Sequence, residues 1–131
     1  MRLDGRELLA IFAGGFVGTV LRADLAEAWS HDPGAWPWAT FVVNLVGAAL
    51  LGYLATSPHA RLAVSAYRRP LLCTGLCGGL TTFSALQLEL LWMLDAGRYG
   101  LAATYAATSV VLGLLSVTST VALARRTRVP A

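Results

Sequence analysis

Four long apolar stretches separated by short polar connections dominate the pattern of the chain. They cover residues 8–28, 36–57, 70–94 and 99–124. Each has about the 20 residues, or more, that a helix needs to cross roughly 30 Å of hydrocarbon. Tryptophan and tyrosine residues, which favour membrane interfaces, mark several ends of the stretches. The pattern predicts an all-α membrane protein, a single domain over residues 1–131 with four transmembrane helices.

The composition supports a membrane environment. Hydrophobic residues make up 56% of the chain and charged residues 13%, whereas soluble domains carry roughly 25% charged residues. A soluble domain of this size would bury only about two-thirds of its surface, too little to hide so many apolar groups. Asp4 and Glu7 interrupt any basic leader, and three further spans follow, so we do not expect the first stretch to be a cleaved signal peptide.

The positive charges are arginines, and their placement predicts an orientation. With four spans, the two termini and the connection between the second and third spans share one side. The other side has at most Arg22 and Arg98. This bias predicts cytoplasmic termini, and the lack of a basic face with interleaved aromatics argues against nucleic-acid binding. The arginines on the predicted cytoplasmic side are Arg2, Arg6, Arg61, Arg68, Arg69, Arg125, Arg126 and Arg128.

The third stretch is rich in glycine and threonine in its middle. Glycine costs about 1 kcal/mol relative to alanine inside a helix. We therefore expect the helix to break near Gly78 and Gly79 and to restart near Thr82. A break frees backbone groups, which are tolerated at membrane depth only where protein buries them or an ion binds them. Freed carbonyls suit a cation, whereas N–H groups and hydroxyls at a helix start suit an anion.

Other polar residues in the spans allow two interpretations each. Arg22 could reach the interface or line an anion entrance. Asn44 could bond a neighbouring helix or offer an N–H group to an anion. A stripe on one face of the fourth span could join helices or form a polar track. Its members are Tyr105, Ser109, Gly113, Ser116 and Thr120. The glycines of the first span favour close helix packing.

No arrangement in the chain predicts an enzyme. The spans contain no carboxylate pair and no nucleophile beside a base. Cys73 and Cys77 lack the further ligands of a zinc site and read as small hydrophobic residues. His31 and His59 fall in connections without an evident partner. Glu89 is the acid within an apolar run, and we expect it toward a vestibule.

The run from Gly75 to Ser84 resembles the signature of the Fluc family of fluoride channels, also called CrcB. Gly14-Gly15-x-x-Gly18-x-x-x-Arg22 and Val43-Asn44-x-x-Gly47 resemble its first and second helices. The resemblance implies a passive fluoride channel in the cell membrane of a prokaryote. It further implies a dimer of two subunits inserted antiparallel, with fluoride pores along their interface and a sodium ion at the centre.

The resemblance also implies site residues. Backbone carbonyls of Gly78 and Thr81 would hold sodium, and the ring edge of Phe83 would face fluoride, because an aromatic edge is the positive part of the quadrupole. Further pore residues implied by the match are Asn44, Arg22, Ser109, Thr82 and Ser84.

One position departs from the family pattern. A second phenylalanine usually follows the first by three residues, but here that position is Leu86. An antiparallel homodimer also needs one sequence to insert both ways, which the arginine bias opposes. We therefore expect a heterodimer with an oppositely oriented homologue, rather than a homodimer. Two other functions remain open: a small proton-coupled multidrug exporter, and a non-conducting structural subunit.

Overall fold

The structure, a computed structural model, describes residues 4–56 and 66–126. Four helical spans in it are long and apolar enough to cross a membrane, and the described residues contain no strand. The predicted all-α membrane fold with four spans is confirmed. The elements are α1 (Gly5–Ala28), α2 (Trp38–Thr56), the π-helical η2 (Pro70–Cys77), α3 (Gly78–Leu80), α4 (Phe83–Asp95) and α5 (Tyr99–Arg126).

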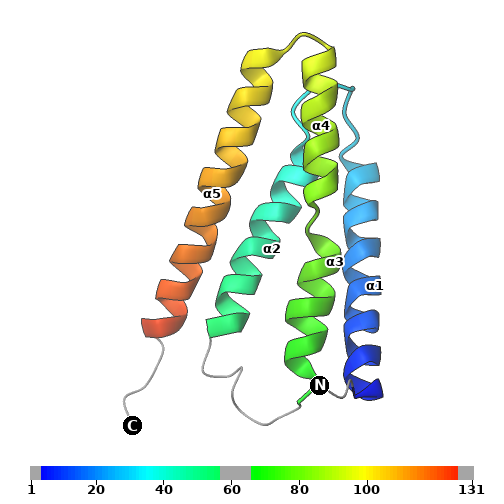
Figure 1. Ribbon diagram of the computed structural model, residues 1–131, viewed down its shortest axis with the longest axis vertical. Helices are drawn as coiled ribbons and strands as arrows, with labels where there is room; N and C mark the ends of the chain where they lie inside the picture. Colours follow the sequence, from blue (N-terminus) through cyan, green and yellow to red (C-terminus); the bar gives the residue numbers. More distant parts are fainter. Residues whose placement is uncertain (1–3, 57–65, 127–131) are drawn as a thin grey trace.

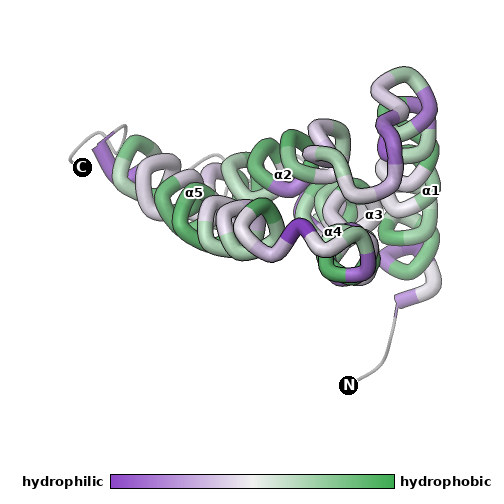
Figure 2. Tube along the Cα trace, turned by 90° about the horizontal axis from the view of Figure 1, so that it is seen from above, coloured by the Kyte–Doolittle hydropathy of each residue, from purple (hydrophilic) through white to green (hydrophobic). Residues whose placement is uncertain are grey.

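The spans form an open row rather than a closed bundle (Figures 1 and 2). The third span, made of η2, α3 and α4, packs against α1 through its first half. Its second half, α4, packs against α5, and α2 packs along α5. α1 and α5 are the outer helices of the row, and the start of α1 and the end of α5 lie at the same end of the long axis of the molecule (Figure 1). One side of the central helices is not covered by the other described residues, since Val46 on α2 and Phe83 on α4 are 46% and 72% exposed.

Glycines bring α1 and the third span into backbone contact. A methyl group on Gly79 would lie 3.0 Å from Cα of Gly15, and one on Gly75 would lie 3.0 Å from Cα of Gly14. Gly18 is likewise closed off by the backbone of the third span. Small residues allow such close approach in lipid, where dispersion drives helix association. These glycines fix the position of the third span on α1.

A buried cluster joins α2, α4 and α5 at the other half of the molecule. It consists of Phe41, Met93, Ala102 and Tyr105. The ring of Trp36 meets Tyr105 edge to face with centroids 5.3 Å apart, a preferred aromatic geometry. This cluster holds α4 beside α5 after the third span has been interrupted.

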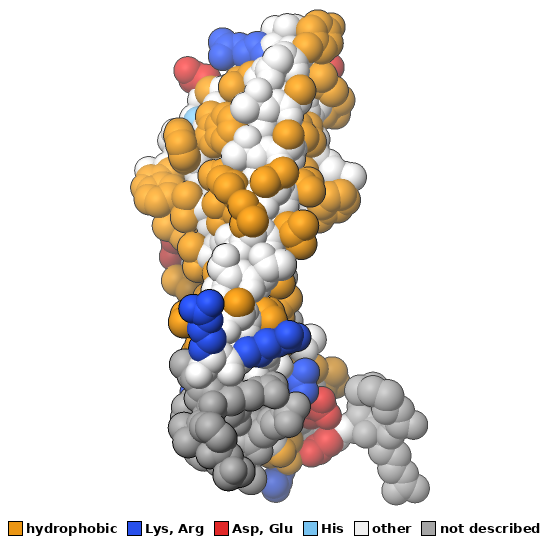
Figure 3. Space-filling view, turned by 90° about the vertical axis from the view of Figure 1, so that its left-hand side faces the viewer, with side chains coloured by type: hydrophobic (Ala, Val, Ile, Leu, Met, Phe, Trp, Pro, Cys, Tyr) orange, Lys and Arg blue, Asp and Glu red, His pale blue; other side chains and the backbone are white. Residues whose placement is uncertain are grey.

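Much of the apolar surface faces outward. Figure 3 shows hydrophobic side chains spread over the face it presents, with arginines toward its ends. On α5, Val110 and Leu114 are 68% and 64% exposed, and Arg125 and Arg126 lie in its last turn. Exposed apolar area of this extent needs lipid or another subunit to cover it.

Candidate ion pathway at the break in the third span

The third span is interrupted at two residues. Thr81 and Thr82 are extended, with φ/ψ of −78°/151° and −149°/118°, between the end of α3 and the start of α4. Gly78 and Gly79 are helical, so the break lies about two residues after the position predicted near these glycines. Gly79 is instead needed for contact with Gly15. The helix does restart beside Thr82, as predicted.

Asn44 on α2 binds the interrupted backbone. Its Nδ2 donates to the Thr82 carbonyl at 3.0 Å, and its Oδ1 accepts from the Thr82 N–H at 2.8 Å. Asn44 thus gives the Thr82 N–H the partner that it has lost at the break. The Thr82 carbonyl, which at the N-cap of α4 already accepts the first bond of that helix, gains a second donor. An amide NH₂ has two donors, so one N–H of Asn44 remains for another acceptor. Both interpretations of Asn44 are therefore compatible with its geometry.

Arg22 on α1 binds the same region from the opposite side. Its Nε donates to the Gly79 carbonyl at 3.3 Å. In a continuous helix that carbonyl would accept from Phe83, and the Gly78 carbonyl would accept from Thr82. Because the Thr82 N–H donates to Asn44, the Gly78 carbonyl loses its helical donor. Arg22 therefore compensates one carbonyl freed by the break.

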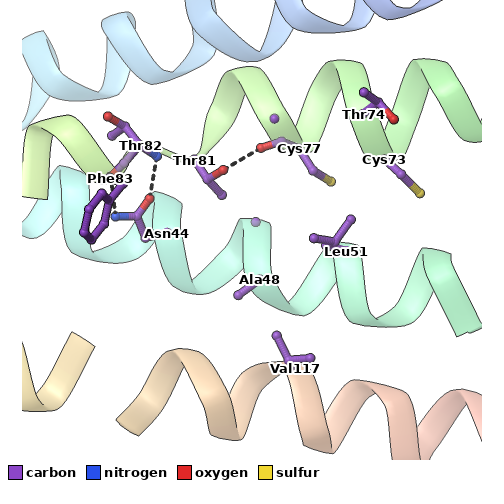
Figure 4. A pocket seen from close by; sticks show the side chains of 12 residues that line it. Asn44, Ala48, Leu51, Cys73, Thr74, Cys77, Thr81, Thr82, Phe83 and Val117 are labelled. Atoms are coloured by element: carbon purple, nitrogen blue, oxygen red, sulfur yellow. Dashed lines mark hydrogen bonds between the residues drawn. The ribbon is translucent and has the colours of Figure 1, made fainter. Parts of the chain in front are cut away.

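The start of α4 directs polar groups and one aromatic ring toward the break. Thr82 caps the helix, since its Oγ1 accepts from the Ala85 N–H at 3.1 Å and lies 3.2 Å from Oγ of Ser84. Thr81 turns its hydroxyl back to the Cys77 carbonyl at 2.9 Å. The side chain of Phe83 is 72% exposed and lies beside Asn44 (Figure 4). A helix start carries partial positive charge, which favours an anion.

These groups border a pocket of about 480 Å³ between α2, the third span and α5. Asn44, Thr82 and Phe83 lie at one part of it, and Leu51 and Cys73 at another (Figure 4). Cys73 and Cys77 are free thiols that line its wall. Of the other predicted site residues, Gly78 and Thr81 also line this pocket, whereas Arg22, Ser84 and Ser109 do not.

Comparison with known proteins identifies the family. The profile described as "CrcB-like protein, Camphor Resistance (CrcB)" matches residues 9–121. The chain belongs to the CrcB family.

Curated relatives agree with this assignment. The chain is 54% identical over 126 residues to "Fluoride-specific ion channel FluC 1" of Mycobacterium bovis, covering 96% of each protein. It is 42% identical over 113 residues to "Fluoride-specific ion channel FluC" of Phocaeicola vulgatus, covering 86% of this chain and 93% of the relative. It is 39% identical over 115 residues to "Fluoride-specific ion channel FluC 2" of Nocardia farcinica, covering 88% and 82%. These relatives are named as channels and not as enzymes.

In this CrcB chain, part of the polar stripe on α5 is buried. The hydroxyl oxygens of Tyr105 and Ser109 are shielded from solvent and have no hydrogen-bond partner. The same holds for Nε1 of Trp36. Thr120 instead bonds the carbonyl of Ser116 in its own helix at 2.8 Å. Buried polar atoms without partners are rare. The sequence identified Tyr105 and Ser109 by spacing, but Trp36 gave no such signal.

A polar contact that the sequence did not predict joins the connection after α1 to α4. Nε2 of His31 lies 3.0 Å from Oε2 of Glu89. The expectation that His31 has no partner was wrong, because the two residues are 58 positions apart and no local pattern relates them. His59 lies outside the described residues.

The described residues do not bring carboxylate or thiolate side chains together into a metal site. Residues 4–56 and 66–126 contain no group of three or more His, Cys, Asp or Glu side chains arranged to hold a metal. Backbone oxygens are the available hard ligands, which group-1 and group-2 cations prefer. The freed carbonyl of Gly78 and the extended backbone at Thr81 have the right chemistry for such an ion.

Proposed function

We propose that this protein is a subunit of a passive, fluoride-selective channel that lets fluoride leave the cytoplasm of a prokaryotic cell across its plasma membrane. The observation that carries the proposal is the broken third span, held open by Asn44 at Thr82 with Phe83 exposed beside it. Membership of a family whose relatives are named fluoride-specific channels supplies the ion.

Fluoride is a small, strongly hydrated anion, so its pathway must replace water with donors. The remaining N–H of Asn44 and the hydroxyls of Thr82 and Ser84 are such donors at the start of α4. The ring edge of Phe83 adds the positive part of an aromatic quadrupole. Together they give the anion a polar route through an apolar region.

The buried hydroxyls on α5 extend this route. Tyr105 and Ser109 lie one helical turn apart and have no other partner, so each has a donor to offer a passing anion. Arg22, which binds the Gly79 carbonyl, adds positive charge at the side of the break. We place fluoride along Phe83, Asn44 and these hydroxyls.

We propose that a sodium ion bound by the Gly78 and Thr81 carbonyls stabilises the break. The loss of the helical donor at Gly78 supports this assignment. When bound, the ion would supply fixed positive charge at the centre of the assembly. Two carbonyls are too few for a hard cation, so a second subunit would have to contribute the others.

The uncovered side of the row, with its pocket and the exposed ring of Phe83, supports a dimer. We propose an antiparallel pair with an oppositely oriented homologue, with the termini of this chain in the cytoplasm. The eight-to-two distribution of arginines favours one orientation, and Leu86 lacks the ring that the partner would supply. The second candidate function is that of a non-conducting structural subunit. It is favoured only by Leu86, which stands where the family pattern has a phenylalanine.

A growth assay tests the function. A bacterial strain that lacks its own fluoride channel should regain growth in fluoride when it expresses this chain with a homologue. Phe83→Leu should abolish the rescue, whereas Thr118→Ala should not, because Thr118 is exposed and bonds only its own helix. Equal rescue by the Phe83 variant would argue against the proposed pathway.

A further inference from the structure

His31 and Glu89 form an ion pair between the α1–α2 connection and α4. Their side chains are 20% and 9% exposed, so the carboxylate is almost enclosed while the imidazole remains reachable from solvent. A second pocket, of about 370 Å³, opens beside His31 between Trp29 and Trp38. Solvent protons can therefore reach the histidine without crossing the protein.

Glu89 is an acidic residue, and a negative charge is unfavourable near a route for anions. Glu89 is buried on α4, which packs against α5, and the buried Tyr105 and Ser109 hydroxyls on α5 are the donors of the proposed track. A buried carboxylate is costly unless it is paired. A negative charge there would also repel fluoride moving along the hydroxyls. The partner of Glu89 thus sets the net charge that fluoride meets.

We infer that His31 is a proton-sensitive positioning residue that controls fluoride conduction through the charge of its pair with Glu89. The inference rests on the proposed channel function. With a protonated imidazole the pair is neutral, and with a neutral imidazole it carries one negative charge. Histidine changes charge near neutral pH, and glutamate ordinarily does so at lower pH. Conduction should therefore be higher when the imidazole is protonated, at lower pH.

Other charged groups of the described residues lie near the α1–α2 connection and the end of α4, but none of them takes the place of His31 as the partner of Glu89. The acids are Asp24 and Glu27 on α1, Asp32 in the same connection and Asp95 at the end of α4. The cation is Arg98, whose stem lies against Gly34 in the connection, and the tyrosines of α5 are Tyr99 and Tyr105. Within residues 4–56 and 66–126, the His31–Glu89 pair is the ion pair found.

The test is fluoride efflux from vesicles holding the conducting assembly, with the same pH inside and outside. Lowering the pH from about 8 to about 5.5 should raise the efflux of the unaltered protein roughly two- to fivefold. His31→Gln keeps a donor for Glu89 but cannot titrate, so its efflux should stay at the alkaline level. His31→Arg carries a permanent cation, and its efflux should stay at the acidic level.

Matched controls separate the possible outcomes. His59→Gln removes the other histidine of the chain and should leave the pH profile unchanged. Protein-free vesicles measure the leak of hydrogen fluoride, which is subtracted at each pH, and thermal unfolding shows that each variant is folded. A conducting protein with a flat profile, or His31→Gln with the unaltered profile, would overturn the inference. Absence of fluoride efflux at every pH would instead overturn the proposed function, and the inference with it.

Discussion

The side-chain amide of Asn44 makes two hydrogen bonds to the backbone of Thr82, accepting at 2.8 Å and donating at 3.0 Å. Thr82 lies 38 residues further along the chain. The two bonds join α2 to the interruption of the third span and give the orphaned N–H of Thr82 a partner. An unsatisfied backbone group in a membrane costs several kcal/mol, so the interruption depends on this amide.

Replacing Asn44 with alanine should therefore destabilise the fold and stop conduction. The Thr82 N–H would lose its partner and the Thr82 carbonyl its second donor, which should lower the free energy of unfolding by about 1–3 kcal/mol. Denaturation in detergent measures the stability, and fluoride efflux measures the function. Thr118→Ala, which removes an exposed hydroxyl bonded within α5, should change stability by less than about 0.5 kcal/mol. Equal stability of the two variants would contradict the assigned role of Asn44.

Gly79→Ala should separate α1 from the third span. The added methyl group would meet the backbone of Gly15, with 3.0 Å to its Cα, and backbone cannot move aside as a flexible side chain can. We expect a loss of about 1–3 kcal/mol in stability and reduced efflux. Gly100→Ala is the matched control, because nothing lies within 4 Å of the new group. A stable, conducting Gly79→Ala protein would show that the close contact is unnecessary.

Leu86→Phe tests whether this subunit lacks a ring that conduction uses. Leu86 is partly buried against the cluster of Met93 and Tyr105, so the larger ring should cost about 1–3 kcal/mol in stability. In the assembly with a homologue, we expect fluoride efflux to rise roughly two- to tenfold. Leu90 packs against the same cluster, so Leu90→Phe should lower the stability in the same way without raising fluoride efflux. Equal efflux from both variants would contradict the prediction that conduction uses an aromatic ring at position 86.

The contact between Tyr67 and Asp4 should be sensitive to alkali. Tyr67 Oη donates to Asp4 Oδ2 at 2.8 Å, and this hydrogen bond is the main cause that raises the pKa of Tyr67 above its ordinary value of 10.0. A raised pKa means that the fold favours the neutral phenol. The stabilisation is therefore complete below pH 10 and is lost as the pH rises through the folded-state pKa.

Ultraviolet titration of tyrosinate measures this shift, and Tyr67→Phe identifies the signal. Asp4→Asn should bring the pKa of Tyr67 back toward 10.0, because it removes the charge. Asparagine can still cap α1 as Asp4 does at the Arg6 N–H. An unchanged titration in Asp4→Asn would show that another group causes the shift.

The sequence predicts the spans well, because membrane thickness and hydropathy constrain them directly. The break was predicted in the correct span, near Gly78 and Gly79, and lies about two residues later, at Thr81 and Thr82. Glycine signals either a break or a close approach, and at Gly79 the close approach to Gly15 is what the fold uses. Only the position of α1 in space distinguishes these two roles.

The polar contacts of the site were harder to predict. Asn44 was recognised as a residue that needs a partner, but the identity of Thr82 depends on how α2 crosses the third span. His31 and Glu89 meet across 58 residues, and neither lies in a pattern that relates it to the other. Such pairs depend on packing between elements, which a single sequence does not specify.

Fluoride efflux from liposomes, followed with a fluoride-selective electrode against a chloride control, tests the central claim most directly. The chain is reconstituted alone and with an oppositely oriented homologue. We expect rapid efflux of fluoride but not chloride from the paired assembly, without dependence on a proton gradient, and little efflux from the chain alone. Rapid efflux from the chain alone would contradict the heterodimer. Absence of fluoride efflux in both preparations, or equal movement of chloride, would contradict the channel itself.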